Sequence, residues 1–315
     1  MTANDVKADT AILPAIDLPA PGLHLDVDPD AYRAWPAVCN SDLSCLHESS
    51  PFHVRYRREN PTPPTPSMLI GSALHAAVLE PDTFDHRYVA APPCSAMLAK
   101  GGRCRNAGRV AAGGDWFCGV HAPEGAGVPD GLTILAAEQL EQVRRMADAV
   151  RCHPAAFGVL GDAGNNEVSA RWDLDVPHDD GRYSLACKGR ADALRPTWDA
   201  IVDLKTTASA APSEFERSIA TFGYHRQAAW YVDGLNRLGG AYKHFVIIAV
   251  ENTAPYGVAV YRLMGEAIDA GRAELEPLVK TIAACERLNH WWGYASEFQD
   301  ISLPTWRMRQ IFKQA

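Results

Sequence analysis

Three strand-like segments between residues 166 and 209 limit what this chain can fold into. They read NEVSARWDLDV, YSLACKGRADALRP and DAIVDLKTTAS, and turn residues such as PHDDG separate them. Short apolar or alternating runs bounded by Gly, Pro, Asp and Asn are typical of strands joined by hairpins. The sequence therefore predicts an antiparallel meander at the centre of the fold.

Helical and strand-like segments surround this meander. TILAAEQLEQVRRMADAVRCHP, residues 133–154, has Leu135, Leu140, Val143 and Met146 at helical spacing and ends at a proline. Helical residues 212–239, the strand pair YKHFVIIAVEN and YGVAVYRLM, and a long helix from Gly265 follow the meander. This order predicts a mixed α/β fold, in which a central mixed β-sheet is flanked by helices.

Composition divides the chain into three expected regions. Residues 1–30 are rich in Pro, Ala and Asp and are expected to form a flexible or loosely docked N-terminal arm. Residues 31–315 are expected to form the main domain. Residues 92–125, with many Gly, Arg and Cys and few aliphatic side chains, are expected to be an insertion that needs support other than an apolar core.

Charge and hydropathy narrow the class of protein. The net charge of −8 disfavours a protein that coats nucleic acid nonspecifically, but it allows an acidic enzyme with a local basic groove. No apolar run approaches the roughly 18 to 20 residues that cross a bilayer, and the N-terminus has no basic start followed by an apolar block. We therefore expect a cytoplasmic protein with no membrane partner.

Two opposite charges share one face of the third strand. Because a strand alternates its faces, Asp203 and Lys205 point one way while Val202 and Leu204 point the other way. A hairpin through RPTWDA would place Asp192 beside Asp203. Two close carboxylates suit Mg²⁺ or Mn²⁺, and Lys205 could then hold or deprotonate a water or neutralise an oxyanion. An isolated Asp-x-Lys is more often a surface ion pair, so the interpretation depends on other polar residues.

Those other residues lie on two predicted helices. His75 is the main central polar side chain of the apolar helix in SMLIGSALHAAVLEPDTF, and Glu80 follows it. Gln227 and Tyr231 are four residues apart and so share one helix face. Taken singly, the histidine is typical of a satisfied core residue and the helix pair of a polar surface.

The ordered set GSALHAAVLEP, EVSARWD, CKGRADAL, IVDLKTT and GYHRQAAWYVDG resembles the PD-(D/E)xK nuclease superfamily. The resemblance is to the branch shared by the RecB nuclease domain and the RecE-type exonuclease, exodeoxyribonuclease VIII, and covers about residues 35 to 265. It implies a restriction-endonuclease-like core. It also implies a metal site made by His75, Asp192, Asp203 and the Leu204 carbonyl, with Lys205 as the catalytic lysine. Gln227 and Tyr231 match a motif that contacts DNA and steadies the site, and Glu167 matches an acidic position.

The resemblance also carries an expected activity. It implies a Mg²⁺-dependent (or Mn²⁺-dependent) exonuclease that degrades linear double-stranded DNA from an end, 5′ to 3′, and leaves single strands for an annealing protein in recombination. A homo-oligomer, ring-shaped as in that family, and a phage or prophage origin are expected with it. Two alternatives stay open. One is a nuclease for single strands or for DNA ends, of the CRISPR-adaptation or RecB type; the other is a catalytically silent, zinc-dependent DNA-binding adaptor.

The insertion carries a set of metal-binding residue types. Cys94, Cys104, Cys118 and His121 follow one another with nine, thirteen and two residues between them. Three thiolates and one imidazole fill a tetrahedral zinc site, and metal binding would supply the folding free energy that the segment lacks. The segment resembles the short zinc knuckle of many phage and bacterial proteins, which implies structural Zn²⁺. The alternative is a loop with unpaired surface cysteines.

Basic side chains accompany these cysteines. They are Lys100, Arg103, Arg105 and Arg109, with Trp116 close by in the sequence. Cations next to an aromatic ring suit contacts with DNA phosphates or stacking on bases. A solvated charged loop is the equally open alternative.

Overall fold

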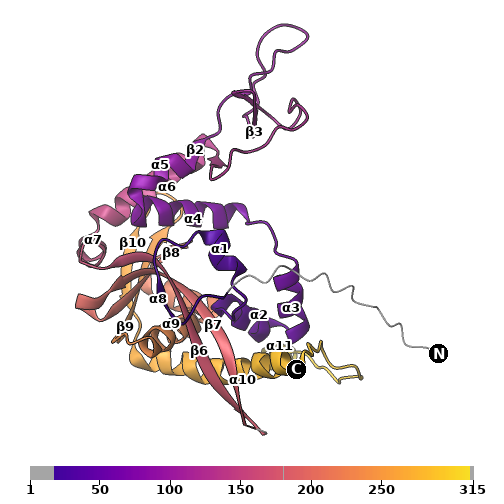
Figure 1. The fold of residues 1–315 in the computed structure, drawn as a ribbon, viewed down its shortest axis with the longest axis vertical. Coiled ribbons are helices and arrows are strands. Elements are labelled where there is room, and N and C mark those ends of the chain that lie inside the picture. The colour runs from indigo at the N-terminus through magenta and orange to yellow at the C-terminus, as the bar shows by residue number, and fades with distance from the viewer. Residues whose placement is uncertain (1–17, 180, 313–315) are drawn as a thin grey trace, which may run out of the picture.

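A six-stranded sheet forms the centre of the molecule (Figure 1). The computed structural model describes residues 18–179 and 181–312. The strands follow the order β1-β6-β7-β8-β9-β10. Their bounds are β1 Gly22–His24, β6 Asn165–His178, β7 Gly181–Arg195, β8 Ala200–Thr207, β9 His244–Glu251 and β10 Val258–Arg262.

Pairing within this sheet is mixed. β6, β7 and β8 form an antiparallel meander, β8 and β9 run parallel, and β10 returns antiparallel to β9. The parallel step requires a crossover, and the helices α8 Pro212–Phe222 and α9 Tyr224–Arg237 supply it. The predicted meander, strand pair and mixed α/β fold are therefore confirmed.

Helices cover both faces of the sheet. On one face, α4 Pro66–Leu79, α6 Ala137–Cys152 and α7 Pro154–Leu160 pack in a core that includes Val202 and Leu204. On the other face, α2 Asn40–Glu48, α9 and α10 Gly265–Leu288 pack in a core that includes Trp172 and Phe245. The alternation of apolar side chains along β8 thus divides the interior into two cores.

Two local features differ from the sequence-based expectation. Leu135 lies in the short strand β5 Thr133–Leu135, and the expected helix begins only at Ala137. The helical segment 212–239 breaks at Gly223, whose φ of 68° is in the left-handed region that favours glycine. In the segment expected to be a flexible or loosely docked arm, β1 pairs with β6 from Gly22 on; residues 1–17 lie outside the described residues.

The cysteine-rich insertion projects from the helical layer (Figure 1). Its neck is the parallel pair of β2 Tyr88–Ala90 and β5, and its hairpin is β3 Val110–Ala112 with β4 Asp115–Phe117. Three cysteines are its buried core, with only Ala96 and Phe117 packed against them. As expected, this segment has almost no apolar core of its own.

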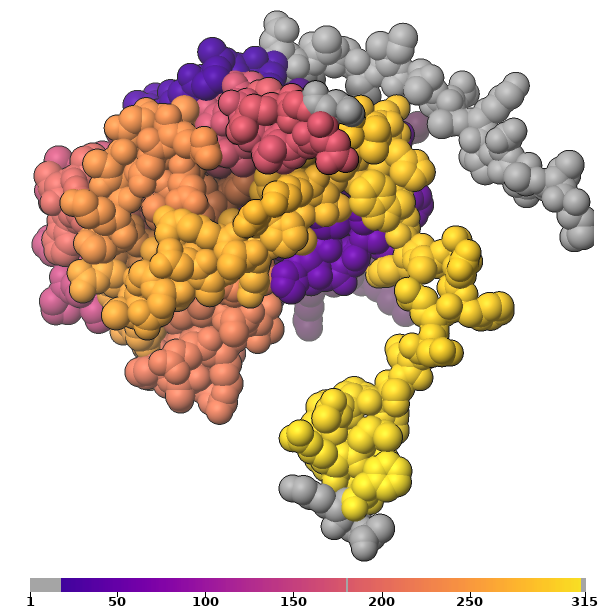
Figure 2. All heavy atoms as spheres, turned by 90° about the horizontal axis from the view of Figure 1, so that it is seen from below, coloured from indigo at the N-terminus to yellow at the C-terminus, as the bar shows by residue number. Residues whose placement is uncertain are grey.

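The remaining elements complete the chain. They are α1 Pro29–Ala34, α3 Pro51–Glu59, α5 Pro81–Arg87, the 3₁₀ helix η1 Pro196–Trp198 and α11 Thr305–Phe312. In Figure 2 the segment after α10 stands away from the rest of the molecule. Among the described residues, none of the helices combines the length and apolar character required of a membrane span.

Candidate active site

The site lies where two strands of the meander separate. β7 and β8 pair only from Ala193↔Val202 to Arg195↔Ala200, next to the turn that joins them. Beyond this point the Leu204 N–H donates to the side-chain carboxylate of Asp192, at 2.7 Å, instead of to the backbone of β7. The predicted hairpin is therefore present, and its strands open at Asp192 and Asp203.

The backbone of β6 is deformed at the same level. Glu167 has φ 51°, a left-handed conformation that costs a non-glycine residue about 1 to 3 kcal/mol. The pairs Asn166↔Ala193 and Val168↔Ala191 flank it, but Glu167 and Asp192 are not paired. Ala191 and Ala193 contribute to different cores although they are two residues apart, so the strand changes faces here. This turn directs Glu167 and Asp192 toward helix α4.

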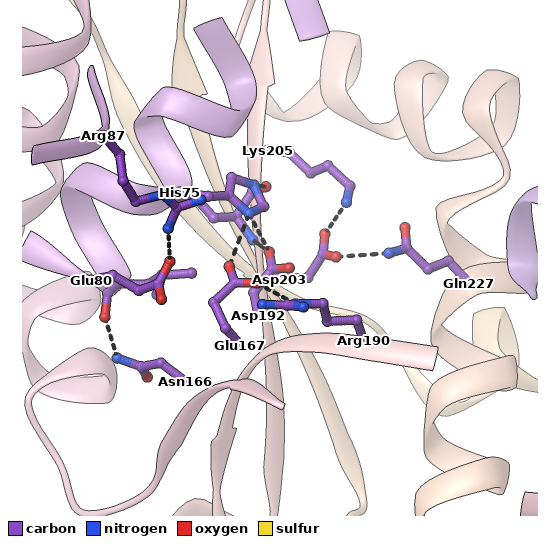
Figure 3. A network of polar contacts seen from close by, with 12 residues as sticks. His75, Glu80, Arg87, Asn166, Glu167, Arg190, Asp192, Asp203, Lys205 and Gln227 are labelled. Carbon is purple, nitrogen blue, oxygen red and sulfur yellow. Dashed lines mark hydrogen bonds and ion pairs between the residues drawn. The ribbon is translucent and has the colours of Figure 1, made fainter. Parts of the chain in front are cut away.

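His75 reaches these carboxylates from α4 (Figure 3). Its Nε2 is 2.8 Å from the Leu204 carbonyl oxygen, which can only accept, so Nε2 carries a proton and donates. Its Nδ1 lies 3.7 Å from Glu167 Oε1 and 3.6 Å from Asp192 Oδ2. Donor atoms of the three residues all lie within 4.8 Å of one another. One imidazole nitrogen and two carboxylates form a donor set that fits Mg²⁺ or Mn²⁺.

Burial and mutual charge shift the pKa values of this trio. Burial lowers the pKa of His75, but the carboxylates of Asp192 and Glu167 outweigh it and raise that pKa to about 9. Burial raises the pKa of Asp192 to about 6; His75 opposes this shift and the Asp203 carboxylate adds to it. Burial also acts to raise the pKa of Glu167, but His75 and Arg190 bring it below its ordinary value. The imidazolium thus compensates two close carboxylates, as a bound cation would.

Asp203 and Lys205 form a second group beside the trio. Lys205 Nζ lies 2.6 Å from Asp203 Oδ2, and Gln227 Nε2 donates to Asp203 Oδ1 at 2.8 Å. Burial lowers the pKa of Lys205, but Asp203 and Asp192 outweigh it and the net shift is upward. The ammonium also lies over the ring of Tyr224, 5.3 Å from its centroid. Lys205 is therefore a fixed cation at neutral pH.

The sequence-predicted ligands are thus divided between two groups. Asp203 does not belong to the close trio, because its two oxygens face Lys205 and Gln227. The Leu204 carbonyl, also expected to face a metal, accepts the hydrogen bond of His75. Glu167, matched only to an acidic family position, lies in the trio.

The polar residues expected on the two helices also have different surroundings. Gln227 reaches Asp203, whereas the ring of Tyr231 stacks on Phe245 with centroids 6.4 Å apart. The Tyr231 ring also fills the space beside Gly189, where an added Cβ would lie 2.5 Å from it. Glu80 forms an ion pair with Arg87 at 2.7 Å. Tyr231 therefore acts here through packing against β7.

Two residues near the site were not singled out from the sequence. Arg190 Nε donates to Glu167 Oε2 at 2.8 Å, and its Nη1 donates to the Val27 carbonyl at 2.9 Å. Tyr224 supplies the ring beside Lys205. Both belong to segments that carry the resemblance, CKGRADAL and GYHRQAAWYVDG, and this is the signal that could have identified them.

The sequence of the chain matches a known protein family. A family model described as "PDDEXK-like domain of unknown function (DUF3799)" matches residues 127–302, just over half of the chain. The chain belongs to this PDDEXK-like family. The nuclease superfamily expected from the ordered motifs is thereby confirmed.

Solved structures add support for the fold of this PDDEXK-like chain. A crystal structure from Eubacterium rectale, named as a candidate exonuclease, is 12% identical over 89% of this chain and 94% of its own, with a TM-score of 0.55. At that identity the likeness concerns the fold alone. A second structure, SSO0001, is 14% identical over 36% of this chain and 49% of its own, and its TM-score of 0.24 carries no argument. The search of curated proteins gives no match.

The cysteine cluster lies outside the PDDEXK-like match, which begins at residue 127. Cys118 Sγ lies 3.4 Å from His121 Nδ1 and 4.0 Å from Cys104 Sγ, and Cys94 Sγ lies 3.7 Å from the same nitrogen. All four donor atoms are within 4.8 Å of one another, and the cysteines are buried. Burial acts to raise the pKa of the Cys118 thiol, but hydrogen bonds from Asn106 and from backbone N–H groups outweigh it and lower that pKa to about 6. The predicted four residues are thus brought together as one donor set.

Proposed function

We propose that this chain is a metal-dependent exonuclease that hydrolyses phosphodiester bonds of linear double-stranded DNA from an end. The observation that carries the proposal is the opening between β7 and β8. There the donor set of His75, Glu167 and Asp192 lies beside a partly buried, protonated Lys205. The PDDEXK-like family supports a nuclease, and the DNA substrate and exonuclease action are proposed on the motifs.

The chain's own residues have separable roles in this proposal. His75 Nδ1, Glu167 and Asp192 would hold Mg²⁺ or Mn²⁺, which supplies Lewis-acid polarisation of a phosphate oxygen and a more acidic bound water. Arg190 fixes the Glu167 carboxylate, and the Leu204 carbonyl fixes the His75 ring. Lys205, oriented by Asp203, offers its positive charge to the phosphate oxygens on which charge develops.

Asp203 has two roles in the proposal. As a family ligand position it is proposed to complete the metal shell together with the Leu204 carbonyl. In the structure its carboxylate orients Lys205 and is itself held by Gln227. Tyr231, proposed from the motif as a DNA contact, steadies β7 through its packing.

The finer parts of the function are proposed on the RecE-type resemblance. They are degradation from 5′ to 3′, release of single strands to an annealing protein for recombination, and a ring-shaped homo-oligomer. The proposed layout has the exonuclease domain over residues 31–315, with residues 92–125 inserted in it. Structural Zn²⁺ is proposed for Cys94, Cys104, Cys118 and His121, because four protein donors leave no position open for a substrate.

A cleavage assay on end-labelled linear duplex tests the function. With Mg²⁺, duplex labelled at the 5′ end should release labelled mononucleotides early, and duplex labelled at the 3′ end should release its label late. A chelator should stop both reactions. Faster degradation of single strands than of duplex would instead favour the end-processing alternative, and no metal-dependent cleavage of any DNA would overturn the proposal.

A further inference from the structure

Four cations on the cysteine-rich insertion have no carboxylate partner in the part of the chain that the structure describes. Lys100, Arg103, Arg105 and Arg109 are exposed, and none of them forms an ion pair within residues 18–179 and 181–312. Several exposed cations outside the insertion are paired, since Arg144 pairs with Asp85 and Arg217 with Glu214. The charges of the insertion are therefore available to an external anion.

The metal-binding loop itself presents these cations. Cys104 is buried, and its neighbours Arg103 and Arg105 are exposed, as expected when an extended chain alternates its side chains. The Cys104 N–H donates to the Ala96 carbonyl at 2.8 Å, which closes a short hairpin with Lys100 near its tip. A metal that fixes Cys104 would therefore also fix the direction of the basic side chains around it.

An aromatic ring lies beside the fourth cation. The Arg109 N–H donates to the Phe117 carbonyl, which places Arg109 next to the strand that carries Trp116. Trp116 is half-buried and packs against Gly108, where an added Cβ would lie 2.8 Å from Trp116 Cβ. The insertion thus combines cations with an anchored ring.

Charge is distributed unevenly between the insertion and the rest of the chain. Residues 92–125 contain four Lys and Arg against two Asp and Glu, a net of +2. Since the whole chain carries −8, the other residues carry −10. A Zn²⁺ bound by three thiolates adds about −1 and leaves the insertion positive. A polyanion is therefore attracted to the insertion while the body of the molecule repels it.

We propose that the insertion is an arm that binds the phosphate backbone of duplex DNA. The proposal rests on the proposed function, because it assigns the insertion to the same substrate. Duplex DNA presents one charge about every 1.7 Å along its axis, which suits several cations on one small surface. The arm would hold the duplex beyond the end that enters the site.

Salt dependence of binding is the quantity that tests this. Fluorescence anisotropy with a labelled blunt duplex of about 30 base pairs, with Ca²⁺ in place of Mg²⁺, gives the slope of log K against log salt. Each lost phosphate contact should reduce this slope by about 1. We expect the combined change Lys100→Gln, Arg103→Gln, Arg105→Gln and Arg109→Gln to reduce it by about 3 to 4 and to weaken binding at least about tenfold at 0.1 M salt.

A control variant removes the same number of positive charges from the surface of the main domain, outside the insertion. It combines Arg144→Gln, Arg145→Gln, Arg217→Gln and Lys243→Gln, whose side chains are exposed and already paired. Its slope should equal that of the unchanged chain. Equal slopes for the arm variant and this control, with circular dichroism unchanged, would overturn the proposal, and so would tighter binding of duplex RNA than of duplex DNA.

The two proposals fail separately. Lys205→Ala should not cleave duplex, and its salt slope should fall by at most about 1, against about 3 to 4 for the arm variant. If the unchanged chain binds duplex with the expected salt slope but does not cleave it, the proposed nuclease function fails and the proposed arm stands. If the unchanged chain cleaves duplex and the arm variant has the same salt slope, the proposed arm fails and the nuclease function stands.

Discussion

Lys205 shows how neighbouring residues set the role of a single side chain. Removing an ammonium from water, even in part, is costly unless it is paired, and here Asp203 compensates the partly buried Lys205 on one side and the ring of Tyr224 on another. Its raised pKa makes it a poor general base at neutral pH. Of the roles considered from the sequence, the raised pKa disfavours deprotonation of a water and is consistent with neutralising a developing oxyanion.

Replacing Lys205 tests that role. Lys205→Ala should lower kcat on end-labelled duplex by about 10²- to 10³-fold or more, as expected when one charge that stabilises the transition state is lost. Thermal unfolding should show that the chain still folds. Lys243→Ala removes an exposed lysine that pairs with Asp199 and should cleave normally. Full activity of Lys205→Ala would contradict the assignment of Lys205.

The protonation state of His75 should make metal binding depend on pH. Its pKa of about 9 means that Nδ1 is protonated at pH 7 in the absence of metal, and a metal needs that nitrogen without its proton. Binding should therefore release a proton, and Mn²⁺ affinity should rise with pH up to about pH 9, by at most about tenfold per pH unit. Isothermal titration at several pH values measures this. His75→Gln should bind more weakly and with a flatter pH dependence, and a flat profile for the unchanged chain would contradict the ligand assignment.

At the scale of elements, the cysteine-rich insertion is stabilised separately from the two cores. Its buried cluster consists of three cysteines, whereas the cores draw on helices and strands elsewhere in the chain. Folding of the insertion should therefore depend on the metal, and folding of the cores should not. This separation makes the zinc proposal testable by a single substitution.

The zinc content of the chain should depend on Cys118. The purified chain should contain about one Zn²⁺, and Cys118→Ala should lose most of it, because three donors bind zinc far less tightly than four. Elemental analysis measures the zinc, and cleavage of short duplex reports on the core. Cys152→Ala, which changes an exposed cysteine outside the cluster, should keep its zinc. Equal zinc in the two variants would argue against the site.

The elements predicted well are those with a clear run of strand-forming residues. β6, β7 and β8 could be predicted from the sequence because short apolar or alternating runs form them and turn residues end them. The left-handed Glu167 could not, because nothing in its residue type signals a positive φ. Nor could the docking of β1, which depends on an open edge of β6 that lies far away in the sequence.

The candidate site could be predicted from the sequence to about the same extent as the fold. The motifs placed His75, Asp192, Asp203 and Lys205 near one another, since each motif occupies a fixed position on its strand or helix. Motifs could not show which carboxylate joins the histidine. That depends on the change of faces at Glu167 and Asp192, which only the three-dimensional path of the strands reveals.

At the scale of the whole molecule, the C-terminal segment exposes large apolar side chains. Phe298, Ile301 and Trp306 are among the exposed residues, and Figure 2 shows the segment away from the body. Closer to the core the chain is anchored, because the Phe52 N–H donates to the Trp292 carbonyl and Tyr294 packs on His53. Contiguous apolar surface is one of the features that mark contacts between protein chains, so this segment is where we expect the proposed homo-oligomer to form.

Shortening the chain should therefore change its assembly. A chain that ends at Ser296 keeps the contacts of Trp292 and Tyr294 but loses the exposed residues, and we expect it to have the mass of one chain in light scattering after size exclusion. The full chain should have a multiple of that mass. Phe298→Ser with Ile301→Ser should shift the mass in the same direction. An unchanged mass in both variants would mean that the proposed homo-oligomer forms through another surface.

Helix α4 also links two regions that have so far been treated apart. It places His75 in the site, it ends at Leu79, and α5 then leads directly into Tyr88 at the neck of the insertion. Because the chain from His75 to Arg87 is helical except at the single residue Glu80, the span from His75 to the neck has a nearly constant length. If the insertion holds DNA, this span acts as a ruler, and the shortest duplex that can occupy both regions at once has a minimum length set by the protein.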